Sequence, residues 1–238
     1  MIADAVGIAE SSAAVDLMVD PEDQLRSNAY NLLGHLLAAP PSQESLDMLG
    51  AIDPDSNADE TLLGAAWQML QVAAGRTTVQ QLDDEYHELF IGVGRGEMMP
   101  YGSWYMTGFL MEQPLALLRT DLDQMGFQRQ EGVAEPEDHA AALCEVMGLS
   151  ISSGSALEQQ AEFFARHIAP WMGRFFRDMQ QAKCAHFYRA VGQLGEQFIE
   201  VESQAFRMAV PDVLNTAAST RMSARARGST NTKSDQEG

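Results

Sequence analysis

Apolar residues recur at intervals of three and four through most of this chain, and this spacing limits the possible folds more than any other feature. Between 25 and 37 the leucines fall on one side of a helix, and Pro40 ends the segment. Thr78 and Gln81 are spaced as a capping box at the start of another helix. No run of four or more residues alternates like a β-strand, so the sequence predicts an all-α fold. The expected helices are 25–37, 44–49, 57–74, 78–90, 114–125, 136–147, 157–168, 170–182 and 186–208.

The chain divides into one predicted domain and two flanking segments. The helical pattern covers 21–210, which is long enough to bury a substantial core as a single helical bundle. Residues 1–20 are expected to form a flexible N-terminus. Residues 211–238 are rich in Ser, Thr, Arg and Gly and have little to bury, so they are expected to form a disordered polar tail.

The charge balance is strongly acidic. There are 34 Asp and Glu residues against 15 Lys and Arg, which gives a formal charge of −19. Nucleic acid is therefore not expected as a partner, because phosphate binding depends on clustered Lys and Arg. A cationic partner fits this charge better, since opposite fields steer association.

Cysteine usage and the N-terminus indicate a cytoplasmic protein. Cys144 and Cys184 are too few for a disulfide framework and are not spaced as CxxC. Residues 1–20 contain no Lys or Arg and no long apolar run, unlike a secretion signal. No stretch approaches the roughly 18 apolar residues that span a bilayer, so no stable membrane insertion is expected.

An unusual group of aromatic residues follows a glycine-rich break at 92–96. Tyr101, Trp104, Tyr105 and Phe109 give four aromatic rings within nine residues. Spacing alone slightly favours a core corner in which the rings fill an irregular gap. The same rings would also suit a peptide-binding surface, because aromatic side chains offer a large contact area at low entropy cost.

A second unusual segment, 135–139, contains adjacent Asp138 and His139 at the start of a predicted helix. The favoured interpretation is a helix cap, since an acidic residue in the first turn is stabilised by the helix dipole. The alternative is a metal- or acid–base-dependent hydrolase that uses Asp138 and His139. No GxSxG, HExxH or Walker motif accompanies the pair, and a metal site with Cys144, Glu145 or His167 matches no standard ligand spacing. We therefore expect no catalytic residue and no metal site, and a buried core position for His167.

Several short motifs in a fixed order resemble the TorD/DmsD family of redox-enzyme maturation chaperones, over about 25–208. The motifs are Glu85-Tyr86-x-x-Leu89-Phe90-x-Gly92, Pro100-x-x-Ser103-x-Tyr105, Glu135-Pro136-x-Asp138-His139, His167-Ile168-x-Pro170-Trp171 and Phe187-Tyr188. Each motif alone is weak, but their order and spacing outweigh the core-corner interpretation of the aromatic group.

The resemblance implies a cytoplasmic chaperone that is not an enzyme. Such a protein binds the twin-arginine signal peptide and the folding body of a molybdenum-cofactor oxidoreductase, and it holds this catalytic-subunit precursor until the cofactor is inserted. Formate dehydrogenase and the DMSO or TMAO reductases are compatible clients. A monomer or a segment-exchanged dimer is implied, with a hinge near 132–136. Guanine-nucleotide binding has been suggested within the family, but no motif here would hold phosphates, and we expect no cofactor.

The resemblance also implies which residues bind the client. We expect the apolar part of the signal to lie against aromatic and apolar side chains, and its arginines to pair with acidic groups near Asp138. The expected client-binding residues are Leu89, Phe90, Pro100, Tyr101, Ser103, Trp104, Tyr105, Pro136, Asp138 and His139.

Overall fold

The computed structural model describes residues 6–8, 20–51, 61–129 and 135–213. Its two short strands are β1 (Val6–Ile8) and β2 (Phe127–Arg129). Its helices, in chain order, are α1 (Pro21–Ala38), α2 (Gln43–Ala51), α3 (Leu62–Ala74), α4 (Val79–Tyr86), η2 (His87–Ile91), α5 (Gly102–Thr107), α6 (Gln113–Gln124), α7 (Ala140–Ser152), α8 (Leu157–Phe163), η3 (Phe164–Ile168), α9 (Met172–Gln181) and α10 (Phe187–Ala209).

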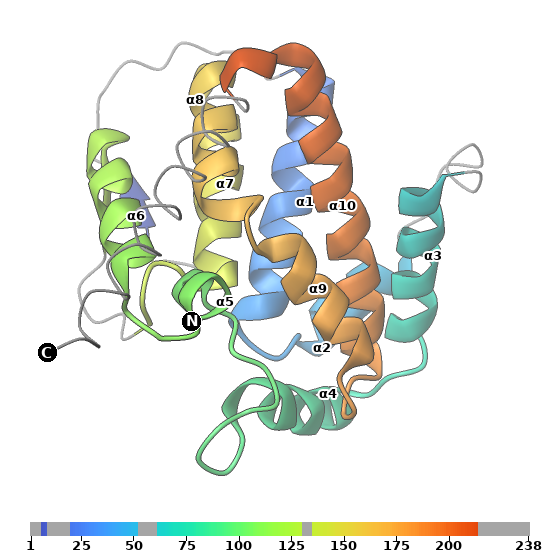
Figure 1. Cartoon of the computed structure of the whole chain (residues 1–238). Coiled ribbons are helices and arrows are strands. Elements are labelled where there is room, and N and C mark those ends of the chain that lie inside the picture. The colour runs from blue at the N-terminus through green and yellow to red at the C-terminus, as the bar shows by residue number, and fades with distance from the viewer. Residues whose placement is uncertain (1–5, 9–19, 52–60, 130–134, 214–238) are drawn as a thin grey trace, which may run out of the picture.

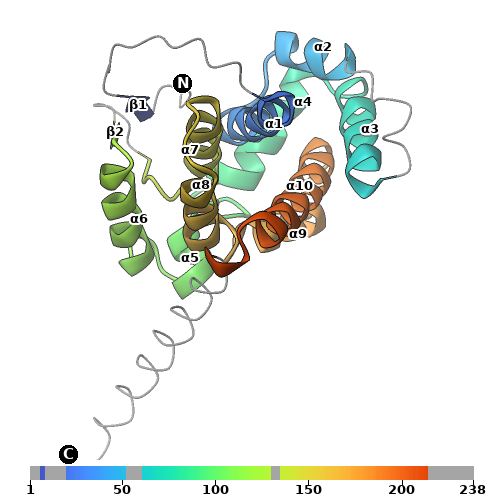
Figure 2. The same ribbon diagram turned by 90° about the horizontal axis from the view of Figure 1, so that it is seen from above.

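The long helices form a bundle in which α1 packs along α7, and α10 packs along α9 and α3 (Figure 1). Seen from above, α7 and α8 lie beside α1, while α3 and α6 stand at opposite edges (Figure 2). Helix α7 is buried on nearly every side, as expected for a run such as Ala140-Ala141-Ala142-Leu143 that is apolar all round. None of the described helices combines the length and the apolar character that crossing a bilayer needs.

Two glycines allow α1 and α7 to approach closely. A Cβ atom on Gly34 of α1 would lie 3.3 Å from the carbonyl oxygen of Ala141, and one on Gly148 of α7 would lie 2.1 Å from Oδ1 of Asn31. The Ser27 hydroxyl also donates to the carbonyl of Gly148 at 2.9 Å. Larger side chains at these glycines would force the two central helices apart.

The first residue of the Glu85-Tyr86 motif caps a helix about a hundred residues further along the chain. The Glu85 side chain on α4 is buried, and its carboxylate accepts the backbone N–H groups of His186 at 2.7 Å, Phe187 at 3.1 Å and Tyr188 at 2.8 Å. These groups open α10 and have no partner inside the helix. A negative charge at this end is also favoured by the helix dipole.

Two tyrosines tie the same region to the end of α1. The Tyr86 hydroxyl lies 3.2 Å and 3.1 Å from the carbonyl oxygens of Leu37 and Ala38, and the Tyr188 hydroxyl donates to that of Leu36 at 2.9 Å. The last carbonyls of a helix lack intrahelical partners, so these bonds satisfy the C-terminal end of α1. One joint therefore connects α1, α4 and α10.

A buried ion pair joins the opposite end of α10 to α1. The guanidinium of Arg26 donates to both carboxylate oxygens of Glu202, at 2.8 Å and 2.9 Å, and Glu202 is 2% exposed. Arg26 also reaches Asp23 at 2.7 Å and the side chain of Gln160 on α8 at 3.2 Å. Two parallel hydrogen bonds between a guanidinium and a carboxylate have a defined geometry, so this ion pair fixes the rotation of α10 relative to α1.

The all-α prediction is confirmed, as is the capping box formed by Thr78 and Gln81. The pairing of β1 with β2 was not predicted, because three-residue strands are too short to show alternation. That strand β1 lies within the segment expected to be flexible, whereas residues 1–5 and 9–19 lie outside the described part. Of the expected disordered tail, 211–213 are helical, and 214–238 lie outside the described residues.

The cap on α10 predicts a large stability effect at one position of α4. Glu85→Ala should lower the free energy of unfolding by about 3 kcal/mol, because three N–H groups, those of Phe187 and Tyr188 at buried positions, lose a charged acceptor. The neighbouring Asp84→Ala, at an exposed position, should change it by less than about 0.5 kcal/mol. Urea unfolding of both variants tests this, and equal stabilities would show that α10 does not depend on the cap.

Candidate functional site

The two segments singled out by their motifs meet in space. Tyr101 and His139 form an isolated antiparallel bridge, in which Gly102 N–H donates to the Asp138 carbonyl at 2.9 Å and Ala140 N–H donates to that of Pro100 at 2.8 Å. The bridge brings the start of α5 against the start of α7. This 101/139 joint makes the two sequence motifs neighbours, although 37 residues separate Tyr101 from His139.

Asp138 lies inside the joint and not on its surface. Its side chain is 4% exposed, and Oδ2 accepts the Ser103 N–H at 2.7 Å, which caps the short helix α5. The other carboxylate oxygen, Oδ1, and the Ser103 hydroxyl are both buried, and neither has a hydrogen-bond partner among the described residues. In this arrangement Asp138 holds a helix start and is closed to a client arginine.

His139 is the N-cap of α7. Its Nδ1 accepts the Ala141 N–H at 3.1 Å, and its ring packs edge-on against the Tyr101 ring. Burial lowers the pKa of His139 to about 4, so the imidazole is neutral at pH 7. It therefore acts as a cap and is not paired as an acid or base with Asp138.

The other acidic groups near the joint have internal partners. The Tyr101 hydroxyl donates to the Glu135 carboxylate, and burial together with this bond raises the pKa of Tyr101. Glu137 pairs with Arg119 at 2.9 Å and with Arg129 at 3.7 Å, and the hydrogen bond from Arg119 helps to lower the pKa of Glu137. The carboxylates that we expected to receive client arginines are thus engaged within the protein.

The remaining predicted site residues separate into core and surface. Leu89 and Ser103 have no exposed surface, Pro100 is buried, and Pro136 is half-buried. Phe90 is partly buried and packs its ring against the rings of Tyr86 and Tyr188. In the described conformation these residues pack inside the protein more than they face a partner.

Trp104 and Tyr105 are half-buried, and each ring stacks with an arginine. The guanidinium of Arg95 stacks 4.6 Å from the Trp104 ring centre, and that of Arg174 lies 4.8 Å from the Tyr105 ring centre. A small depression of about 350 Å³ lies between them. Burial and the nearby Asp178 raise the pKa of Tyr105.

An exposed apolar loop runs from Met106, at the end of α5, to Met111 before α6, and of its apolar residues only Phe109 was singled out in the sequence. Met106, Phe109, Leu110 and Met111 are 40%, 68%, 41% and 71% exposed. The signal was present, because Gly108, with φ +85°, ends α5 and Pro114 opens α6, which leaves the residues between them outside any helix. This apolar loop extends the surface of Trp104 and Tyr105.

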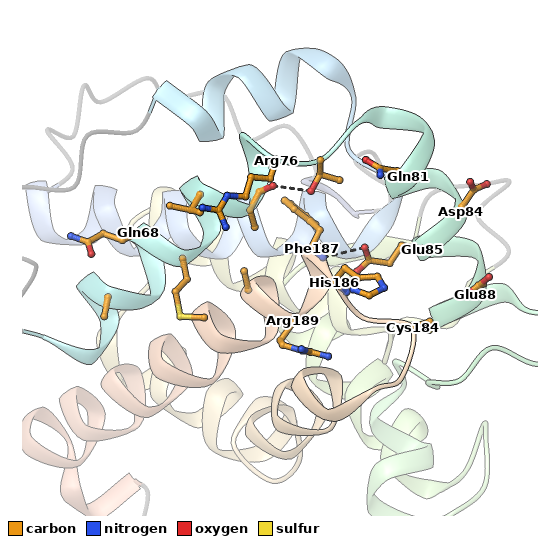
Figure 3. A pocket seen from close by; sticks show the side chains of 16 residues that line it. Gln68, Arg76, Gln81, Asp84, Glu85, Glu88, Cys184, His186, Phe187 and Arg189 are labelled. Atoms are coloured by element: carbon orange, nitrogen blue, oxygen red, sulfur yellow. Dashed lines mark hydrogen bonds between the residues drawn. The ribbon is translucent and has the colours of Figure 1, made fainter.

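A larger groove of about 880 Å³ also escaped the sequence interpretation (Figure 3). It lies between α3, α4 and the first turn of α10, which are brought together by the Glu85 cap. Glu85 and Phe187 of the quoted motifs line it, but the sequence does not show that α10 meets α3 and α4, because about a hundred residues separate these segments.

The residues of the alternative hydrolase interpretation do not form a catalytic site in the described part of the chain. No three His, Cys, Asp or Glu side chains there come together in a way that could hold a metal ion. As predicted, His167 is buried in the core, where Nε2 lies 2.5 Å from Oδ2 of Asp121. Burial raises the pKa of the Cys144 thiol, which does not favour a nucleophile.

Comparisons with known proteins indicate the family of this chain. Residues 56–177 match the family model of the nitrate reductase delta subunit. The TorD chaperone of Vibrio cholerae serotype O1 is 28% identical over 159 residues, which cover 60% of this chain and 72% of the relative. The TorD chaperone of Shewanella pealeana is 24% identical over 207 residues, which cover 78% of this chain and 91% of that one.

Among solved structures, a candidate redox enzyme maturation protein from Archaeoglobus fulgidus is similar, with a TM-score of 0.44 and 15% identity over 80% of this chain and 99% of that one. The family match and the curated relatives define the class as a chaperone and not an enzyme. The chain belongs to the nitrate reductase delta subunit family, and within it to the TorD chaperones.

The geometry of the joint predicts a structural role for Asp138. Asp138→Ala leaves the buried Ser103 N–H without an acceptor and should lower the free energy of unfolding by about 1–3 kcal/mol. Asp138→Asn keeps an oxygen for this bond and should cost less. Urea unfolding measures both effects. If both variants were as stable as the wild type but failed to bind the client, Asp138 would be a binding residue.

Proposed function

We propose that this protein is a cytoplasmic chaperone for a molybdenum-cofactor oxidoreductase of the formate dehydrogenase or DMSO/TMAO reductase type. It binds the twin-arginine signal peptide and the folding body of the catalytic-subunit precursor. By holding the precursor, it assists cofactor insertion and assembly before export. Membership of the TorD chaperones supports this proposal.

The observation that carries the proposal is a contiguous aromatic and apolar surface on a strongly acidic protein. Trp104, Tyr105 and the apolar loop follow one another along 104–111, and Phe109 and Met111 expose most of their side chains. Exposed apolar segments of this kind mark interaction sites. The formal charge of −19 favours a client segment that is both basic and apolar.

Titration calorimetry with signal peptides from the molybdoenzymes of the same genome tests the proposal. One peptide should bind, and the same peptide with both arginines changed to lysine should bind about tenfold more weakly, since lysine lacks the bidentate geometry of arginine. Failure of every peptide and every full-length precursor to bind would contradict the proposed function.

The apolar loop should contribute to binding of the full-length precursor. Phe109→Ser should weaken that binding about tenfold, because a buried phenylalanine contributes about 1.5–3 kcal/mol. Leu25→Ser is a matched control, since Leu25 on α1 is 71% exposed and Phe109 is 68% exposed. Equal weakening by the two variants would show that the loop has no particular role.

A further inference from the structure

The groove between α3, α4 and α10 has two chemically different walls. The wall on α3 is apolar, because Ala65, Met69 and Val72 are spaced at four and three and all line the groove. Met69 and Val72 remain 49% and 47% exposed. A stripe of this kind offers side-chain contact to an apolar segment that lies along the helix.

The opposite wall, on α4 and the adjoining η2, is polar and acidic. Gln81, Asp84 and Glu88 line the groove at spacings of three and four, and the Asp84 and Glu88 side chains are labelled along one edge in Figure 3. Glu85, between them, is occupied by the N–H groups of α10. Within the described part of the chain, neither Asp84 nor Glu88 forms an ion pair, in contrast to Glu137 at the 101/139 joint.

Two arginines lie on other sides of the same opening. Arg76 follows the end of α3, and Arg189 is on the first turn of α10 (Figure 3). Both are exposed and form no ion pair with the described residues. The charges of the groove are therefore segregated, so a bound segment will be oriented by its own charge.

We propose that this groove binds the arginine-bearing part of the client's signal peptide. The arginine side chains pair with Asp84 and Glu88, and the apolar residues that follow them lie along Met69 and Val72. This inference rests on the proposed function and moves the charged contact from Asp138, which is enclosed, to carboxylates that are open to a guanidinium. The volume of about 880 Å³ is within the range of ligand sites.

Charge variants on the two sides of the groove test the orientation. In fluorescence anisotropy titrations of the full-length protein with a labelled signal peptide, the double variant Asp84→Asn, Glu88→Gln should raise Kd about tenfold. The matched control is Asp83→Asn, since Asp83 is on the same helix but faces His87 outside the groove. Arg189→Gln removes a repulsive charge and should leave Kd unchanged or lower it.

An apolar pair tests the other wall. The double variant Met69→Ser, Val72→Ser should raise Kd about tenfold. Val201→Ser on α10 is its control, since Val201 is 44% exposed and lies outside the groove. Thermal unfolding of each variant confirms that the fold is retained.

The outcomes separate the two proposals. If the wild type binds the signal peptide but neither wall variant changes Kd, the groove proposal is overturned and the proposed function stands. If the α4 variant tightens binding and Arg189→Gln weakens it, the groove prefers an acidic segment, which also overturns the inference. If the wild type binds no signal peptide, the proposed function itself fails.

Discussion

The buried carboxylate of Glu85 is the interaction on which the rest of the structure depends most. It accepts three backbone N–H groups at the start of α10, the longest described helix, and so fixes α4 against a segment a hundred residues away. The next residue, Tyr86, satisfies the last carbonyls of α1. Asp84 on α4 and Glu88 on the adjoining η2 line the edge of the groove, so one local sequence connects three helices and forms one wall of the proposed binding groove. A short motif can therefore hold helices together even where the sequence suggests that it contacts a partner.

Much of the fold could be predicted because helical periodicity is a local property. The start of α4 was predicted from Thr78 and Gln81, and the long helix at 186–208 agrees closely with α10. The turns of π-helix at η2 and η3 and the pairing of β1 with β2 could not be predicted. They depend on tertiary packing and on strands too short to leave a pattern.

The candidate site was only partly predictable. A helix cap was the favoured interpretation of the Asp138-His139 segment, but the sequence did not show that Asp138 caps α5, a helix from another part of the chain, or that both side chains are buried. Burial depends on what packs above a residue, and here the Tyr101 ring and the start of α5 enclose the pair. The groove was missed for a similar reason, since its apolar and acidic walls lie on different helices. The sequence of a single helix shows Met69 or Glu88 only as an ordinary surface residue.

Asp138 holds a structural joint, whereas the proposed binding groove is bounded by α3 and α4. Amide hydrogen exchange with and without the signal peptide tests this separation most directly. Ligand binding slows exchange where it suppresses local opening. We predict slower exchange in 62–76, 81–91 and 186–192 when the signal peptide is bound, with little change in 135–147. Slowing confined to 100–107 and 135–147, with α3 and α4 unaffected, would contradict it and return the signal to the joint.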